Sequence, residues 1–170
     1  MDNLHVVLVD QNDHDLGIME KMQAHKAGLL HRAFSVVIFN SKKEMLLQQR
    51  AADKYHSARL WTNACCSHPQ KGEDIRASAT RRLYFEMGLR CELTPAFQFT
   101  YFAQLDHDLI EHEYDHVFTG LTDEPPRPNP QEVQNYMWMS LELLQEKLNT
   151  EPENFTQWFH LLFEKMMETL

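Results

Sequence analysis

Residues 61–69, WTNACCSHP, contain the densest group of side chains in this sequence that can transfer protons or bind a metal. Thiolates are nucleophiles and metal ligands, and imidazoles exchange protons near neutral pH. The segment ends a predicted strand, in which neighbouring residues point to opposite faces, so Cys66 and His68 share one face and Cys65 takes the other. Most intracellular cysteines are small buried side chains rather than reactive groups, and that alternative stays open for both cysteines.

A second group of candidate ligands is spread over two other segments. Glu111 and Glu113 alternate, so they lie on one face if the chain is extended there, whereas on a solvated loop they are ordinary surface charge. His25 and His31 are too far apart for one helical turn, but a loop can bring them together. With His68 these side chains supply three imidazoles and two carboxylates. Such a set suits a divalent cation with more than four ligands, Mn²⁺ or Mg²⁺, and Zn²⁺ also accepts these donors.

The overall composition limits the classes of protein to consider. The 170 residues include 16 Lys and Arg against 25 Asp and Glu, a formal net charge of −9, which argues against a sequence-independent nucleic-acid binder. No apolar run is long enough to cross a bilayer, and residues 1–9 lack the basic start and long apolar stretch of a signal peptide. Three cysteines, an odd number, do not suggest a disulfide framework. We expect a reduced, cytoplasmic setting without membrane or nucleic-acid partners.

Most of the chain that positions these residues reads as strands. Short runs rich in Val, Ile, Leu and Phe predict strands at residues 5–9, 33–39, 44–49, 60–66, 96–104, 113–119 and 136–139. Residues 40–43 are typical of a hairpin turn, and residues 106–112 form an acidic loop with histidines. Four prolines make residues 122–131 a loop, to which the sequence assigns no role.

The remaining segments predict helices. Apolar residues spaced by four predict an amphipathic helix over residues 73–87, which Gly88 ends. Residues 141–148 predict a second helix, and aromatic residues between 155 and 166 predict a third whose apolar face needs a partner surface. Strands interspersed with helices indicate one α+β domain spanning residues 1–170.

Residues 67–89 resemble a degenerate Nudix box, the loop and helix with the pattern G-x5-E-x7-R-E-U-x-E-E-x-G-U, where U is aliphatic. Six positions match in register, namely Glu73, Arg81, Leu83, Glu86, Gly88 and Leu89. Ser67 replaces the first glycine, and Arg82 and Phe85 replace two glutamates. The resemblance implies a Nudix-type mixed β-sheet sandwiched by helices. Because Nudix hydrolases use those glutamates to hold metal ions against a diphosphate, hydrolysis should be impaired here.

Along nearly its whole length the sequence also resembles the type 1 isopentenyl-diphosphate Δ-isomerases, a Nudix branch. Residues 62–69 and 111–113 are the most specific motifs, and further matches are Glu20–Lys21 with His25 and His31, residues 46–54, 81–88 and 155–158. The resemblance implies an enzyme of isoprenoid biosynthesis that interconverts isopentenyl and dimethylallyl diphosphate. A Nudix-type diphosphate hydrolase is the alternative enzyme, and a metal-stabilised ligand sensor is the alternative that is not an enzyme.

The same resemblance implies roles for four residues in the reaction. Cys66 and Glu113 would face opposite sides of the substrate, with Glu113, beside Tyr101, supplying a proton and Cys66 removing another. The sequence does not fix which of the two is the acid in each direction. The indole of Trp158 would stabilise the intermediate cation by cation–π attraction, although Trp158 also lies on the apolar stripe of the last helix.

The resemblance further implies one divalent metal held by His25, His31, His68, Glu111 and Glu113. The interval between His25 and His31 is one residue shorter than in the family pattern, which leaves the exact family counterpart of His25 open.

The implied substrate is a small isoprenoid diphosphate. Lys21, Arg50, Lys54 and Arg82 match positions that contact the diphosphate, and arginine can bind phosphate oxygens through two parallel hydrogen bonds. A Mg²⁺ ion would bridge the diphosphate and Glu86. We expect the protein to be a monomer.

Overall fold

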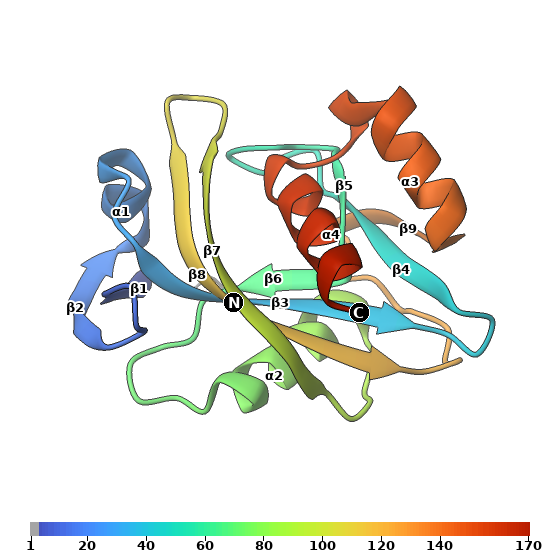
Figure 1. The fold of residues 1–170 in the computed structure, drawn as a ribbon, viewed down its shortest axis with the longest axis horizontal. Coiled ribbons are helices and arrows are strands. Elements are labelled where there is room, and N and C mark those ends of the chain that lie inside the picture. The colour runs from blue at the N-terminus through green and yellow to red at the C-terminus, as the bar shows by residue number, and fades with distance from the viewer. Residues whose placement is uncertain (1–3) are drawn as a thin grey trace.

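The central element of the fold is strand β3 (His31–Phe39), which runs through the middle of a mixed sheet (Figure 1). The computed structural model describes residues 4–170, so the first three residues of the segment tested for a signal peptide lie outside the described residues. Nine strands form the sheet within residues 4–170. The other strands are β1 (His5–Val9), β2 (Asp15–Glu20), β4 (Glu44–Arg50), β5 (Trp61–Thr62), β6 (Cys65–Ser67), β7 (Thr94–Gln104), β8 (Ile110–Leu121) and β9 (Val133–Ser140).

Helices cover both faces of this sheet, and the apolar run in β3 explains why. The helices are α1 (Lys21–Ala27), α2 (Ile75–Met87), α3 (Leu141–Thr150) and α4 (Gln157–Thr169), with a short 3-10 turn at Pro152–Asn154. Val36 packs in the core with α2, whereas Val37, on the opposite face of β3, packs with α3 and α4. A strand buried on both faces needs a run of apolar residues, and residues 36–39 supply it in β3. The predicted α+β class, with helices on both faces of a mixed sheet, is confirmed.

The register of β3 with its neighbours determines which side chains meet. β3 runs parallel to β8 along one edge, with His31 opposite Glu113. Its other edge pairs with β6, where Ser35 lies opposite Cys66. The far half of the β7–β8 hairpin extends away from the sheet between α1 and α4 (Figure 1). Segments remote in sequence therefore meet around the first half of β3.

The predicted strands and helices all have counterparts, with three corrections. Residues 110–112 belong to β8 and not to the acidic loop, because β7 pairs with them as far as Gln104 opposite Ile110. The strand predicted over residues 60–66 is interrupted at Asn63, whose side-chain amide donates to the carbonyl oxygens of Val36 and Cys65. The helix predicted from residue 73 begins at Ile75, after Asp74 caps its first turn.

Strand β2 and helix α1 were not predicted from the sequence. The exposed side chains of β2 include Leu16 and Ile18, so the strand lacks the alternation of buried apolar and exposed polar residues. Helix α1 has only seven residues and is capped by Glu20, whose carboxylate accepts from two backbone N–H groups of the first turn. Gly28 ends it at φ 67°. Within residues 4–170, no helix combines the length and apolar character needed to cross a membrane.

Candidate active site

A polar cleft of ≈ 460 Å³ lies where α1, α2, α4, β6 and β8 meet. Ten of the residues predicted for the site line it: Lys21, His25, Arg50, Lys54, Cys66, His68, Arg82, Glu111, Glu113 and Trp158. The other three, His31, Tyr101 and Glu86, are buried and contact lining residues. The fold therefore brings the whole predicted set to one place.

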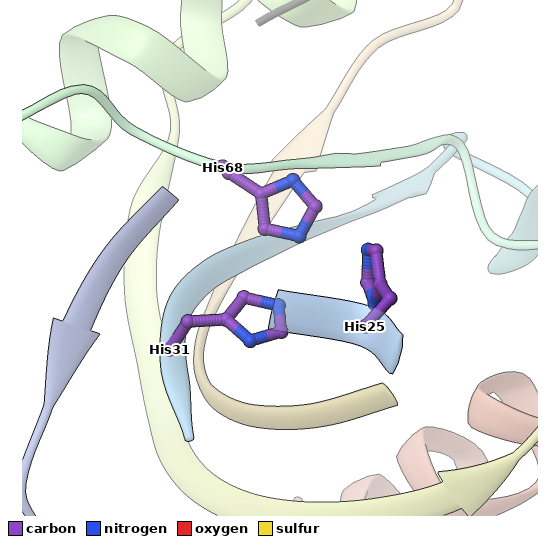
Figure 2. Close-up of side chains that lie close together, drawn as sticks. All are labelled: His25, His31 and His68. Atoms are coloured by element: carbon purple, nitrogen blue, oxygen red, sulfur yellow. The ribbon is translucent and has the colours of Figure 1, made fainter. Parts of the chain in front are cut away.

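Three histidines converge at the inner end of the cleft (Figure 2). His25 comes from the last turn of α1, His31 begins β3, and His68 follows β6, and their ligand nitrogens all lie within 4.8 Å of one another. His25 and His31 donate from Nδ1 to the carbonyl oxygens of Ile110 and Leu29, at 3.0 and 2.8 Å. A bond of this kind fixes the tautomer and leaves Nε2 free as a ligand atom.

The state of these nitrogens fits a metal site. The Nε2 atoms of His25 and His31 are buried and have no hydrogen-bond partner. Burial lowers the pKa of His25 and lowers that of His68 to about 4, so the rings are neutral at pH 7, the form that binds metal. Three imidazoles whose ligand nitrogens all lie within 4.8 Å of one another can hold a divalent cation. The shorter interval between His25 and His31 does not keep them apart, because α1 and the turn at Gly28 bring them together.

Two carboxylates border the histidines. Glu111 and Glu113 lie on the same face of β8 and both are buried, so the interpretation as surface charge is wrong. Glu113 Oε1 lies 3.1 Å from Nε2 of His68 and 3.5 Å from Nε2 of His31. The Tyr101 hydroxyl lies 2.5 Å from Glu111 Oε1 and 3.1 Å from Glu113 Oε2.

The groups around Glu111 and Glu113 shift the pKa values of the two carboxyl groups in opposite directions. Burial and the charge of Glu113 raise the pKa of Glu111 well above its usual range. Burial opposes ionisation of Glu113 too, but the neighbouring His68, 3.1 Å away, outweighs it and holds the pKa of Glu113 well below its usual range. Glu111 is therefore the more readily protonated member of the pair.

Cys66 lines the cleft on the side of β6. Cys65 packs against α2 in one core and Cys66 joins a second cluster beneath Trp158, so the prediction of opposite faces is confirmed. Cys66 Sγ lies 3.3 Å from Asn63 Oδ1 and 3.4 Å from Ser35 Oγ. Burial raises the pKa of the Cys66 thiol, which is therefore protonated at pH 7. The interpretation as a small buried side chain holds for Cys65, which does not line the cleft.

An aromatic wall closes one side of the cleft. Trp158 is 3% exposed and packs both in the cluster with Cys66 and against the cleft. The guanidinium carbon of Arg50 lies 5.2 Å from its ring centroid, and His56 meets it edge-on at 5.7 Å. Lys21 lies over the ring of Tyr55, 5.3 Å from its centroid.

The outer end of the cleft is positively charged but contains carboxylates. Arg82 donates from Nε to Glu86 Oε2 at 2.5 Å and lies 3.3 Å from Glu132. Lys54 forms an ion pair with the same Glu132. Glu86 also accepts from Gln48 at 3.0 Å. Glu86 and Glu132 therefore pair with the partly buried cations of this end of the cleft.

Sequence reasoning missed several residues of this site. Tyr55 and His56 lie in the irregular segment 51–60, where no periodic pattern marks a side chain as inward-facing. Glu132 follows the proline-rich segment, which was assigned no role, yet its end lines the cleft. Asn63 lies inside the motif of residues 61–69, so the candidate residues on either side of it were the signal that could have identified it.

A family model, relatives in sequence and a solved structure all match this chain. A family model described as NUDIX domain matches residues 29–159. The chain is similar to the isopentenyl-diphosphate Delta-isomerase of Pectobacterium atrosepticum, 55% identical over 161 residues that cover 95% of this chain and 90% of that protein. It is 48% identical over 162 residues to isopentenyl-diphosphate Delta-isomerase 1 of Aromatoleum aromaticum, with 95% and 92% covered. The solved structure of DR0079 from Deinococcus radiodurans matches with a TM-score of 0.79 at 17% identity, covering 97% of this chain and 98% of that one, a likeness in fold alone.

Proposed function

This chain belongs to the NUDIX family and, within it, to the isopentenyl-diphosphate Δ-isomerases, and we propose that Cys66 and Glu113 are its acid–base pair. The enzyme interconverts isopentenyl diphosphate and dimethylallyl diphosphate. One observation carries the assignment of the pair. Cys66 and Glu113 line the same cleft from β6 and β8, strands that flank β3 on opposite edges. A substrate in the cleft can therefore meet one group on each side.

The chemistry explains why the site is enclosed. A proton added to the terminal carbon of the alkene leaves a tertiary cation at the next carbon, and loss of a proton from the following carbon forms the internal double bond. An alkene is a very weak base, so the proton donor has to be well placed and water has to be kept from the cation. Burial of Glu113 and Trp158 supports both requirements.

For isopentenyl diphosphate we assign proton donation to Glu113 and proton removal to Cys66. The Tyr101 hydroxyl, within hydrogen-bond distance of both Glu111 and Glu113, offers a path by which a proton on Glu111 can reach Glu113. In the opposite direction the two groups exchange roles. In the free chain, burial raises the pKa of the Cys66 thiol and His68 holds the pKa of Glu113 low. Cys66 is therefore protonated and Glu113 ionised, which is the starting state for conversion of dimethylallyl diphosphate to isopentenyl diphosphate.

Trp158 is proposed to stabilise the cation with its indole. A desolvated cation–π contact contributes about 2 kcal/mol, and an indole is electron-rich without being a good nucleophile. Its burial beside Cys66 supports a site for the cation at this wall.

The metal is proposed to be Mn²⁺, Mg²⁺ or Zn²⁺, held by His25, His31, His68, Glu111 and Glu113. The unpaired Nε2 atoms of the first two histidines support this assignment. A bound cation would supply a fixed positive charge that lowers the pKa of its carboxylate ligands, so a proton held by Glu113 would be a stronger acid toward the alkene.

The diphosphate is proposed to bind Lys21, Arg50, Lys54 and Arg82, with a Mg²⁺ ion shared by the diphosphate and Glu86. All four cations line the cleft, which supports this placement. A diphosphate hydrolase is less well supported, because Arg82 and Phe85 stand where the Nudix box has glutamates.

We also propose that residues 1–170 act as one domain and as a monomer, since the proposed site draws every residue from one chain. A cytoplasmic setting is proposed because the thiol of Cys66 has to stay reduced to exchange protons.

Incubation of the purified protein with isopentenyl diphosphate and Mg²⁺ in deuterated water tests the function. We expect dimethylallyl diphosphate with deuterium in its new methyl group. Released phosphate without a rearranged product would contradict an isomerase and support a hydrolase.

A further inference from the structure

Asp115 is a buried carboxylate that the proposed reaction leaves without a role. It follows Glu111 and Glu113 on the same face of β8 and is 1% exposed. Its Oδ1 atom is buried without a hydrogen-bond partner. A buried carboxyl group with an unsatisfied oxygen is costly in either protonation state, so a structural role alone explains this residue poorly.

The other oxygen of Asp115 connects it to the cleft through one residue. Ser35 Oγ donates to Asp115 Oδ2 at 2.7 Å and lies 3.4 Å from Cys66 Sγ. The sheet builds this connection, because Ser35 on β3 pairs with Cys66 on β6 along one edge and β3 pairs with β8 along the other. Asp115, Ser35 and Cys66 thus form a line from the protein interior to the cleft.

The hydrogens in this line have defined directions. The single hydroxyl hydrogen of Ser35 goes to Asp115, so Ser35 presents a lone pair to the sulfur. Asn63 donates its two amide hydrogens to the carbonyl oxygens of Val36 and Cys65, so only its oxygen is directed at Cys66. The sulfur therefore lies between two acceptor oxygens, at 3.3 and 3.4 Å, and its S–H has two defined directions.

We propose that Ser35 and Asp115 are positioning residues for Cys66. Asp115 orients the Ser35 hydroxyl, and the oriented oxygen holds Cys66 Sγ at the cleft wall in the position from which it exchanges a proton with the substrate. This inference rests on the proposed function of Cys66. Neither residue lines the cleft, so both act on turnover through the sulfur and not through substrate contacts.

Kinetics of the metal-loaded full chain test the proposal. Because a displacement of about 1 Å in a reacting group costs about 100-fold in rate, we expect Ser35→Ala to lower kcat between about 10-fold and 100-fold. KM for isopentenyl diphosphate should stay within about two-fold, since the proposed diphosphate contacts are elsewhere. Asp115→Ala should lower kcat similarly, and the double variant should lower it no further, because both residues act through one contact.

Conservative variants separate positioning from loss of the fold. Asp115→Asn keeps an oxygen that accepts from Ser35, and Ser35→Thr keeps a hydroxyl, so both should recover most of kcat. Ser78→Ala, at another buried serine outside the proposed machinery, is the matched control and should leave kcat unchanged.

Alkylation of Cys66 by iodoacetamide, followed by mass spectrometry, adds a readout that does not require turnover. The alkylation rate should change several-fold in Ser35→Ala and not in Ser78→Ala. A value of kcat within two-fold of the unmodified protein in Ser35→Ala, or multiplicative losses in the double variant, would overturn the proposal. If the unmodified protein fails to isomerise, the proposed function fails, whereas the alkylation rates still test the contact.

Discussion

Arg50 stacks on Trp158, with its guanidinium carbon 5.2 Å from the centroid of the indole ring. Arg50 is proposed to bind the diphosphate, and Trp158 is proposed to stabilise the carbocation. The contact therefore joins the two ends of the substrate site. Neutralisation of Arg50 by phosphate would reduce the positive charge that the indole already faces and leave its quadrupole more available to the cation.

This contact predicts that Arg50 affects the chemical step as well as binding. Arg50→Lys keeps the charge but loses the planar group that stacks and binds phosphate through two bonds. We expect KM for isopentenyl diphosphate to rise about 10-fold and kcat to fall about five-fold, since each lost contact of this kind costs about 1 kcal/mol or more. Lys54→Ala, at a cation that pairs with Glu132, should change mainly KM. A change in KM alone for Arg50→Lys would show that the stacking contact has no role in turnover.

Cys66→Ala is expected to separate turnover from binding. Loss of the proton-exchanging thiol should lower kcat by at least about 1,000-fold, in the range typical of an essential acid or base. Calorimetric titration with isopentyl diphosphate, the saturated analogue, should give a Kd within about three-fold of the unmodified protein. Cys65→Ala is the matched control, because Cys65 faces the core beside α2 and should keep its turnover. A hydrolase or a ligand sensor would be insensitive to Cys66→Ala.

Metal removal provides an independent test of the histidine cluster. Chelation should abolish isomerase activity, and added Mn²⁺ or Mg²⁺ should restore it. His25→Ala removes one of the two unpaired buried nitrogens and should lower metal affinity about 10-fold to 100-fold. Elemental analysis of the dialysed protein measures the loss. Full activity in protein shown to be free of metal would contradict the proposed site.

The free energy of unfolding should fall as the pH drops below neutrality, because His56 has a much lower pKa in the folded chain than in the unfolded chain. Burial, with Arg50 as the next cause, lowers the pKa of His56 from 6.5 to about 2 in the folded chain. Between about pH 2 and pH 6.5, His56 binds a proton in the unfolded chain but not in the folded chain, so acid favours unfolding. The effect is absent above about pH 6.5. At pH 5 it amounts to about 2 kcal/mol.

His56→Phe keeps a ring beside Trp158 and removes this titration. Urea unfolding at pH 7.5 and pH 5 measures the effect in both proteins. The unmodified protein should lose about 2 kcal/mol more than His56→Phe between these conditions. Metal release over the same range affects both proteins and cancels in the difference. Equal losses would mean that His56 is protonated in the folded chain.

Local patterns were enough to identify most elements, whereas the roles expected for the site residues came from the resemblance to a family. The alternation of Glu111 and Glu113 required only that the chain be extended there, and residues spaced by four were enough for α2 because that helix packs one face in the core. The placement of His25 was not predictable in this way. It depends on a seven-residue helix with an unusual cap, and tertiary contacts rather than an intrinsic pattern stabilise such a helix.

The role proposed for Asp115 shows a second limit of the sequence. Asp115 lies two residues beyond Glu113, so the strand predicted over residues 113–119 was enough to place both on one face. Its partner Ser35 is 80 residues away, and only the pairing of β3 with β6 and β8 brings the two together beside Cys66. A register between distant strands leaves no periodic signal in the sequence.

Gly88, which ends α2, packs against the segment that leads to Glu132 at the outer end of the cleft. Gly88 has φ 65°, and a Cβ atom there would lie 2.8 Å from the backbone oxygen of Arg127. The N–H of Arg127 donates to the carbonyl oxygen of Met87 at 2.7 Å, and the N–H of Asn129 donates to that of Glu86 at 2.8 Å. The segment that leads to Glu132 is therefore held against the helix and cannot move aside without losing these bonds.

Gly88→Ala is expected to destabilise the protein and to weaken diphosphate binding. The left-handed conformation costs an alanine about 1–2 kcal/mol, and the clash with Arg127 adds about 1–3 kcal/mol. Gly72→Ala is the matched control, because Gly72 has φ 78° but no atom within 4 Å of its added Cβ, so it should lose only the conformational part. Displacement of Glu132, 3.3 Å from Arg82, should raise KM for isopentenyl diphosphate in Gly88→Ala alone. Equal free energies of unfolding for the two variants would show that the segment carrying Arg127 moves aside freely, and the link between this turn and the cleft would then be wrong.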